Sequence, residues 1–76
     1  GYKIMETLMD VFIGAAINPN RFYSQQLIRR VSSQYDIHSD NLETRIMAVI
    51  DYISGMTDIY ALDIYQKING MSLPII

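Results

Sequence analysis

The chain of 76 residues contains no cysteine and no tryptophan, and it has only one histidine and two prolines. The lack of cysteine excludes disulfide bonds, thiolate nucleophiles and thiolate metal ligands, and it fits a cytoplasmic protein. The single histidine, His38, leaves no histidine pair or cluster for a metal ion and little basis for a Ser-His-Asp triad. We expect His38 to be a solvent-exposed loop residue; a role as a ligand or proton shuttle is the alternative.

Charged residues are also scarce, at 18% of the chain with a net charge of -2, so the electrostatic signature of a nucleic-acid-binding protein is missing. No apolar run approaches the roughly 20 residues that cross a bilayer, and no signal peptide is recognisable, so neither a membrane segment nor an exported one is expected. Gly14, Gly55 and Gly70 are isolated, which excludes the glycine-rich loops that bind phosphate in nucleotide-binding folds.

Hydrophobic residues make up half of the chain, and their spacing is helical rather than alternating. We predict an all-α protein, a small bundle of about four helices that forms a single segment over residues 1–76 with no second domain. The predicted helices cover residues 2–17, 24–33, 40–55 and 58–69. Asn18-Pro19-Asn20 forms the first turn, residues 34–40 form a connector, and residues 71–76 form an extended tail.

The apolar stripes predict which residues face the core of this bundle. The inward residues of the second helix are Leu27, Ile28 and Val31. Those of the other helices are Ile4, Met5, Leu8, Met9, Phe12, Ala15 and Ala16 in the first, Leu42, Ile46, Val49, Ile50 and Ile53 in the third, and Ala61, Leu62, Tyr65 and Ile68 in the fourth. Tyr60 and Ile64 are expected on the opposite side of the last helix. Because the first helix is apolar over most of its circumference, we expect burial on more than one side, through self-association or a larger helical body.

Local signals predict where the helices begin and end. Ser24 is the expected cap of the second helix, Ser39 or Asp40 that of the third, and Thr57 that of the fourth. Asp58 lies at the positive end of the last helix dipole. Gly55 and Gly70 suit the left-handed residue that often ends a helix, and Asp63 pairs with Lys67 four residues later.

Three groups of side chains have both a structural and a functional interpretation. Asp51, Asp58 and Asp63 share no predicted face, so capping and solvation explain them better than a cation site. Arg21, Arg29 and Arg30 suit a solvated helix face better than contact with a phosphate, a DNA backbone or an acidic neighbour. Six tyrosines and five methionines at helical spacing favour core and interface packing over a base-stacking platform.

The most informative stretch is Asp51 to Leu62, which reads Asp-Tyr-Ile-Ser-Gly-Met-Thr-Asp-Ile-Tyr-Ala-Leu. It resembles the C-terminal conserved stretch of bacterial deoxyguanosine triphosphate triphosphohydrolases, the dGTPase-like enzymes of the HD superfamily. The similarity is most specific at Gly55-Met56-Thr57-Asp58 and Tyr60-Ala61, whereas Ile59 replaces an expected polar residue. The resemblance implies a C-terminal segment of a larger helical enzyme that converts a deoxynucleoside triphosphate to the deoxynucleoside and triphosphate.

The resemblance also implies a parent metal site for Mg or Mn, built from histidines and aspartates, with water as the nucleophile. A chain with one histidine cannot supply that site, so no catalytic, cofactor-binding or metal residue is assigned here and the segment alone is expected to be inactive. Tyr52, Gly55, Thr57, Asp58 and Tyr60 are candidates for shaping the turn, for bordering the nucleotide pocket or for a subunit contact. The expected partners are the remainder of the parent enzyme, other copies of the chain and, for the parent, its dNTP substrate. A free-standing helical interaction module is the alternative function.

Overall fold

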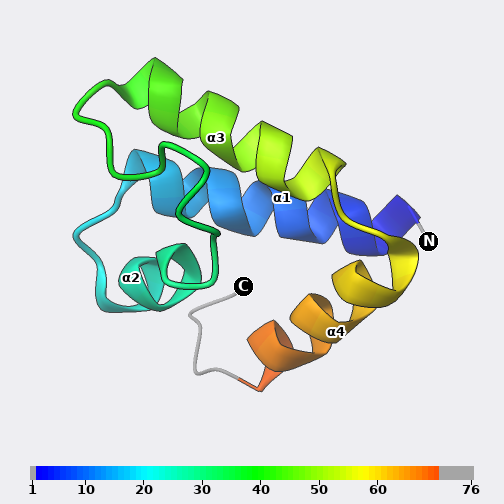
Figure 1. Ribbon diagram of the computed structural model, residues 1–76. Coiled ribbons are helices and arrows are strands. Elements are labelled where there is room, and N and C mark those ends of the chain that lie inside the picture. The colour runs from blue at the N-terminus through cyan, green and yellow to red at the C-terminus, as the bar shows by residue number, and fades with distance from the viewer. Residues whose placement is uncertain (1, 71–76) are drawn as a thin grey trace.

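The computed structural model describes residues 2–70 as four helices joined by turns, with no strand in that range (Figure 1). The helices are α1 (Tyr2–Ile17), α2 (Phe22–Ile28), α3 (Leu42–Ser54) and α4 (Asp58–Asn69). The prediction of a small all-α bundle is confirmed, and α1 and α4 have the predicted bounds. The tail predicted for 71–76 lies outside the described residues.

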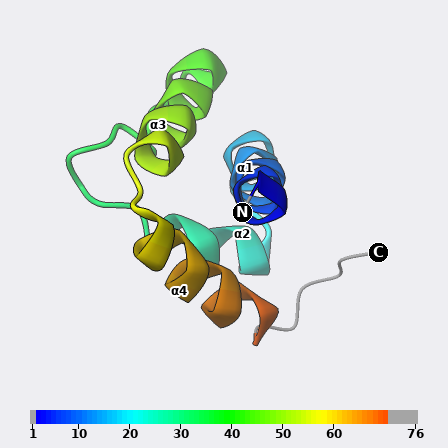
Figure 2. The ribbon, with the colours of Figure 1, turned by 90° about the vertical axis from the view of Figure 1, so that its right-hand side faces the viewer.

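Helix α1 is the common partner of the other three helices, since α2, α3 and α4 all pack against it. Figure 2 looks along α1 and shows α3 on one side of it and α2 and α4 on another. Leu8, Phe12, Ala15 and Ala16 of α1 are almost completely buried. The other three helices of the chain therefore supply cover on more than one side of α1, whereas the sequence suggested that self-association or a larger helical body would be needed; self-association stays a prediction. Ile17, at its end, remains half exposed.

Helix α2 differs from its prediction at both ends. It begins at Phe22 and has only 7 residues, and no side chain caps its first turn. Ser24, the predicted cap, lies inside the helix and is fully buried. The helix stops early because the amides of Arg30 and Val31 bond to carbonyls three residues back, those of Leu27 and Ile28, which tightens the last turn. The predicted inward residues Leu27, Ile28 and Val31 are all buried.

Helix α3 begins two residues later than predicted, and its cap is Asn41 rather than Ser39 or Asp40. The Thr44 amide donates to Asn41 Oδ1 at 3.1 Å, and the Ser39 hydroxyl instead accepts from the Asn41 amide at 3.1 Å. Asparagine caps as well as serine or aspartate, so the polar run allowed several starting points. Ala48 and Tyr52 join Val49 and Ile53 in the core, whereas Leu42, predicted inward, is exposed.

Helix α4 confirms the capping prediction and corrects the predicted buried face. The Tyr60 amide donates to Thr57 Oγ1 at 3.2 Å, and Lys67 Nζ lies 2.9 Å from Asp63 Oδ2. The buried residues are Ala61, Ile64 and Ile68, so Ile64 faces inward and Leu62 is exposed, the reverse of the prediction. A narrow buried stripe is enough because α1 is the main helix that packs against α4.

Both glycines that follow helices also differ from expectation. Gly55 has φ of -86° and Gly70 has φ of -82°, so neither adopts the left-handed conformation that the sequence suggested. Among the described residues, no glycine has positive φ. The α3–α4 joint is therefore a right-handed turn that other residues can adopt. No helix within residues 2–70 combines the length and apolar character needed to span a bilayer.

Candidate functional site

The Asp51–Leu62 segment forms the joint between α3 and α4. Its first residues make the last turn of α3, Gly55 and Met56 connect the helices, and Thr57 caps α4. Asp58 stands in the first turn of α4, where its charge complements the helix dipole. The amides of Gly55 and Met56 donate to the carbonyls of Asp51 and Ile53, so the joint is closed by its own backbone.

Tyr52 is the centre of this joint and is 94% buried, with an exposed fraction of 6%. Its hydroxyl donates to the Arg30 carbonyl oxygen at 3.1 Å, and the Tyr60 hydroxyl lies 3.1 Å away on its other side. Because a phenol has one proton, the Tyr60 hydroxyl must be the donor in the second bond. The Tyr52 ring also meets the rings of Phe12 and Tyr35 edge-on, each at a centroid distance of 5.7 Å. One side chain thus connects α1, α4 and the chain that follows α2.

The environment of Tyr52 raises the pKa of its hydroxyl well above the usual range for tyrosine. Burial is the main cause, because it penalises the charged phenolate. The hydrogen bond with Tyr60 and the neighbouring Tyr60 and Tyr35 groups act in the same direction, while the Arg30 charge opposes them. Tyr52 is therefore held neutral, as a hydrogen-bonding and packing residue rather than a base.

A surface cavity of about 360 Å³ opens beside the joint. Four of the five candidate residues line it, namely Tyr52, Gly55, Thr57 and Tyr60. Asp58 does not; it lines a separate cavity of about 210 Å³ with Ile4, Met5, Ala61 and Leu62. Tyr35 and Met56 also line the joint cavity but were not among the five candidate residues. The sequence contains a signal for Met56, because it lies inside the motif. It contains none for Tyr35, which only folding brings to the cavity.

The joint offers neutral hydroxyls and aromatic rings but no histidine or carboxylate on its cavity wall. Such a set can hydrogen-bond and stack, but it contains no acid–base pair. Within residues 2–70, no three His, Asp or Glu side chains lie close enough to share a metal ion. Asp51 and Asp58 are exposed on different helices, and Asp63 is paired with Lys67. The residues of this chain therefore do not fit the metal site that the resemblance implies for a parent enzyme.

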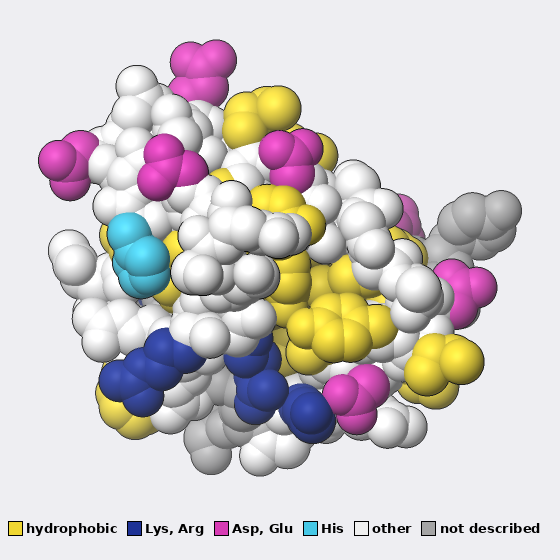
Figure 3. Space-filling view, in the orientation of Figure 1, with side chains coloured by type: hydrophobic (Ala, Val, Ile, Leu, Met, Phe, Trp, Pro, Cys, Tyr) yellow, Lys and Arg dark blue, Asp and Glu magenta, His cyan; other side chains and the backbone are white. Residues whose placement is uncertain are grey.

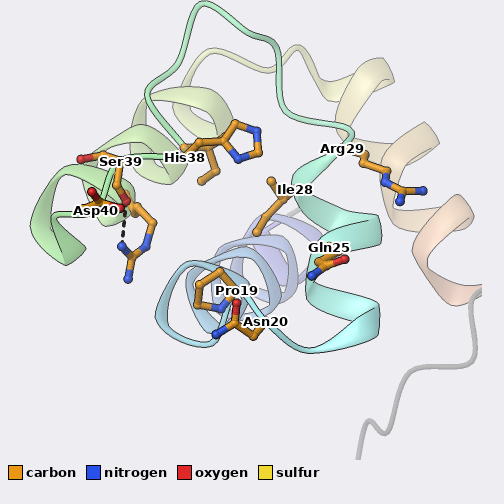
Figure 4. Close-up of a pocket in the computed structure, with 10 residues that line it drawn as sticks. Pro19, Asn20, Gln25, Ile28, Arg29, His38, Ser39 and Asp40 are labelled. Carbon is orange, nitrogen blue, oxygen red and sulfur yellow. Dashed lines mark hydrogen bonds between the residues drawn. The ribbon is translucent and has the colours of Figure 1, made fainter.

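A second cleft, of about 390 Å³, lies at the other end of the molecule. It is bounded by the α1–α2 turn at Pro19 and Asn20, by α2 and by the connector around His38 (Figure 4). His38 is exposed, as predicted, and it marks this cleft in the space-filling view (Figure 3). In that view Lys and Arg gather along the lower edge, over α2 and α4, while Asp and Glu lie mainly above.

Arg45, which also lines this cleft, was not identified from the sequence. Its Nε donates to the Ala16 carbonyl at 2.9 Å, and its Nη1 donates to the Ser39 carbonyl at 2.8 Å. Ala16 belongs to the last turn of α1, whose carbonyls lack helical partners, and α1 itself has no basic residue there. Arg45 thus joins α3 to the end of α1 and to the connector. Because both acceptors are backbone atoms, no sequence motif signals the contact.

Comparison with known proteins gives one family and two relatives. The sequence profile of the phosphohydrolase-associated domain matches residues 2–67. Deoxyguanosinetriphosphate triphosphohydrolase-like proteins of Listeria monocytogenes serovar 1/2a and Listeria innocua serovar 6a are each 33% identical over 95% of the chain. The chain spans only 19% of the length of either relative. No solved structure matches the chain significantly.

Proposed function

Because the chain belongs to the phosphohydrolase-associated domain family, we propose that it is the C-terminal structural and oligomerisation segment of a cytoplasmic deoxynucleoside triphosphate triphosphohydrolase. The parent enzyme would convert dGTP and water to deoxyguanosine and triphosphate. The observation that carries the proposal is the 33% identity, over 95% of the chain, to proteins named as deoxyguanosinetriphosphate triphosphohydrolase-like.

The residues of the chain indicate which part of the parent enzyme's function this segment would carry. Its one histidine and its dispersed aspartates offer no metal site, so a divalent metal ion such as Mg or Mn would be bound by histidines and aspartates elsewhere in the parent. The proposed role of this segment is structural: it would support the catalytic part or join subunits. Its closed α3–α4 joint, centred on a buried tyrosine, is suited to such a rigid support.

An exposed apolar surface supports a contact role. Ile59, in the first turn of α4, is 84% exposed, and Leu62 lies one turn further along with 44% exposed. Ile4 and Met5 of α1, which are partly buried, line the same small cavity as Leu62. Apolar residues grouped in this way mark interaction surfaces more often than isolated ones do. We assign this group, Ile4, Met5, Ile59 and Leu62, to the contact with the catalytic part or with another subunit.

The decisive experiment compares the whole parent polypeptide with a version truncated before this segment. Release of triphosphate from dGTP is measured with Mg or Mn, and the oligomeric state is measured by light-scattering chromatography. The proposal predicts turnover and a defined oligomer for the whole polypeptide, with both reduced after truncation. The 76-residue chain alone should release no triphosphate. Turnover by the chain alone that a chelator abolishes would contradict the proposal.

The upstream coding sequence provides an independent check. A histidine followed by an adjacent His-Asp pair and a further aspartate would support the enzyme class. An unrelated domain in that position would contradict it.

A free-standing helical interaction module is the second candidate, favoured by the same exposed Ile59 and by Phe22, which is 78% exposed on α2. In this case the chain would bind a partner through apolar contacts and would take no part in nucleotide hydrolysis. The substitution Ile59→Asp separates the two candidates when introduced into the native polypeptide. Loss of oligomer and triphosphatase activity supports the first candidate, whereas loss of a bound partner protein from a polypeptide without triphosphatase activity supports the second.

A further inference from the structure

The cleft around His38 has the dimensions and the walls of a small-ligand site. Its volume of about 390 Å³ falls within the range of roughly 300–1,000 Å³ typical of ligand pockets. Figure 4 shows Pro19 and Asn20 on one side, His38 on the opposite side, and Ile28 and Gln25 of α2 between them. The walls thus come from three parts of the chain, and a ligand bound there would contact all three.

The charge of this cleft is opposite to that of the whole chain. Arg29 and Arg45 line it with a single carboxylate, Asp40, so its formal charge is two minus one, or +1, in a chain of net charge -2. The ion pair of Lys67 with Asp63 is the only one within residues 2–70, so neither arginine has a carboxylate within 4.0 Å. The two arginines of the cleft can therefore interact with a bound anion.

Arg45 is held in a fixed position at the wall of this cleft. Its two hydrogen bonds, to the carbonyls of Ala16 and Ser39, fix the guanidinium in a partly buried position. A guanidinium has five N–H groups, so three remain after these two bonds. The amides of Asn20 and Gln25 add further donors, and neither side chain has a hydrogen bond in the described part of the chain. Several donors around one space match the tetrahedral oxygens of a phosphate group.

The cleft also has an apolar wall. Ile28 and Ile37 line it with only 6% and 3% of their surface exposed, and Pro19 adds to this wall. Only a small part of this wall is exposed, and the organic part of a phosphate ester would cover it. We propose that the cleft binds an organic phosphate, with the phosphate on Arg45, Asn20 and Gln25 and the organic body against Ile28, Ile37 and Pro19. This proposal goes beyond the proposed function and does not depend on it.

The test uses the full 76-residue chain and nuclear magnetic resonance of its single histidine, which lies in the cleft and needs no assignment by mutation. The probes are phenyl phosphate, inorganic phosphate and phenol, each titrated at constant pH and ionic strength. We expect phenyl phosphate to shift the His38 ring signals saturably, inorganic phosphate to bind about threefold or more weakly, and phenol to leave them unchanged. Absence of saturation with phenyl phosphate, or an equal response to phenol, overturns the proposal.

A pair of matched variants tests the location. Gln25→Glu places a negative charge in the cleft, and Gln66→Glu makes the same charge change at an exposed position of α4 outside it. Both side chains are exposed, so both variants should keep the helical circular dichroism of the parent chain. Gln25→Glu should weaken phenyl phosphate binding about fivefold or more, with Gln66→Glu near the original affinity. Asn20→Asp repeats the test from the opposite wall. Equal weakening by Gln25→Glu and Gln66→Glu would show a net-charge effect and reject the cleft.

Discussion

The Tyr60 hydroxyl donates a hydrogen bond to the Tyr52 hydroxyl, which in turn donates to the Arg30 carbonyl, each over 3.1 Å. This relay crosses from α4 through α3 to the chain that follows α2. It joins parts of the bundle that make few other contacts with one another, since the helices pack mainly on α1. The hydroxyl of Tyr52 is the one member of the relay that takes part in both bonds.

Tyr52→Phe removes that hydroxyl and should lower the free energy of unfolding by about 1–2 kcal/mol, because the Arg30 carbonyl loses its partner. Tyr60→Phe should cost less, about 0.5 kcal/mol, since Tyr60 is 42% exposed and water can replace its bond. Urea denaturation measures both. Tyr35→Phe is the control, because the Tyr35 hydroxyl has no bond within the described residues. A loss as large for Tyr35→Phe as for Tyr52→Phe would contradict the relay.

Alkaline pH should destabilise the fold through the same residue. The folded state raises the pKa of Tyr52, whereas in the unfolded chain tyrosine ionises near its ordinary pKa of about 10. Above that pH the unfolded chain binds fewer protons than the folded one, so stability is present below about pH 10 and falls above it. The slope from this one residue is at most about 1.4 kcal/mol per pH unit. The stability difference between the original chain and Tyr52→Phe should therefore shrink from pH 9 to pH 11; a constant difference would contradict the assignment.

Arg45→Met should destabilise the bundle by about 2–3 kcal/mol, because it breaks the bonds to the Ala16 and Ser39 carbonyls and leaves both acceptors unpaired. Arg45→Lys should destabilise the bundle less than Arg45→Met does, but it should not restore the original stability, since an ammonium cannot reproduce the planar geometry of both bonds. Thermal and urea unfolding provide the measurement. Arg29→Met, at an exposed arginine whose side chain has no hydrogen bond in the described residues, should change stability by less than about 0.5 kcal/mol.

Ser24→Ala should stabilise the chain. The Ser24 hydroxyl is fully buried and has no hydrogen-bond partner within residues 2–70, and alanine is the better helix former. We expect a gain of about 0.5–1.5 kcal/mol, which raises the melting temperature by several degrees in a domain of this size. Ser54→Ala, at an exposed helical serine, measures helix propensity alone and should give the smaller gain. A loss of stability in Ser24→Ala would mean that the hydroxyl is satisfied in solution.

Gly55→Ala tests the right-handed conformation of the α3–α4 joint. A Cβ at Gly55 would lie 3.4 Å from the Asp51 carbonyl oxygen and 3.7 Å from the Tyr35 hydroxyl, which are ordinary contacts. Alanine should therefore fit and stabilise the fold by about 0.5 kcal/mol, because it restricts the unfolded chain. Had Gly55 adopted a left-handed conformation, the same change would cost about 1 kcal/mol or more. Chemical denaturation measures whether Gly55→Ala raises or lowers the free energy of unfolding.

The sequence was sufficient to predict α1 and α4, whose apolar spacing is strong and whose ends carry turn chemistry, such as Pro19 after α1 and the Thr57 cap of α4. It misplaced α2 because Ser24 has the right chemistry for a cap. Whether that hydroxyl meets a free amide or the core depends on packing against α1, which a local pattern does not contain. The same reason explains α4, where Leu62 and Ile64 are equally apolar and the position of α1 decides which of them is buried.

For the candidate site, resemblance located the joint residues but not their partners. Tyr52, Gly55, Thr57 and Tyr60 are close in sequence, so their common position at one cavity follows from the turn between two helices. Arg30 lies 22 residues from Tyr52, and Arg45 lies 29 residues from Ala16. In both pairs the acceptor is a backbone carbonyl, which every residue possesses, so composition and spacing do not predict these hydrogen bonds.

Since the other three helices all pack on α1, their order along the chain has a consequence during synthesis. Helix α1 leaves the ribosome before the three helices that dock on it, and domains generally fold from the N-terminal side as they emerge. Each of α2, α3 and α4 can therefore find its final partner already present, without waiting for a later segment. We expect productive docking to proceed in chain order, so that the Tyr52–Tyr60 bond forms last and completes the nascent bundle.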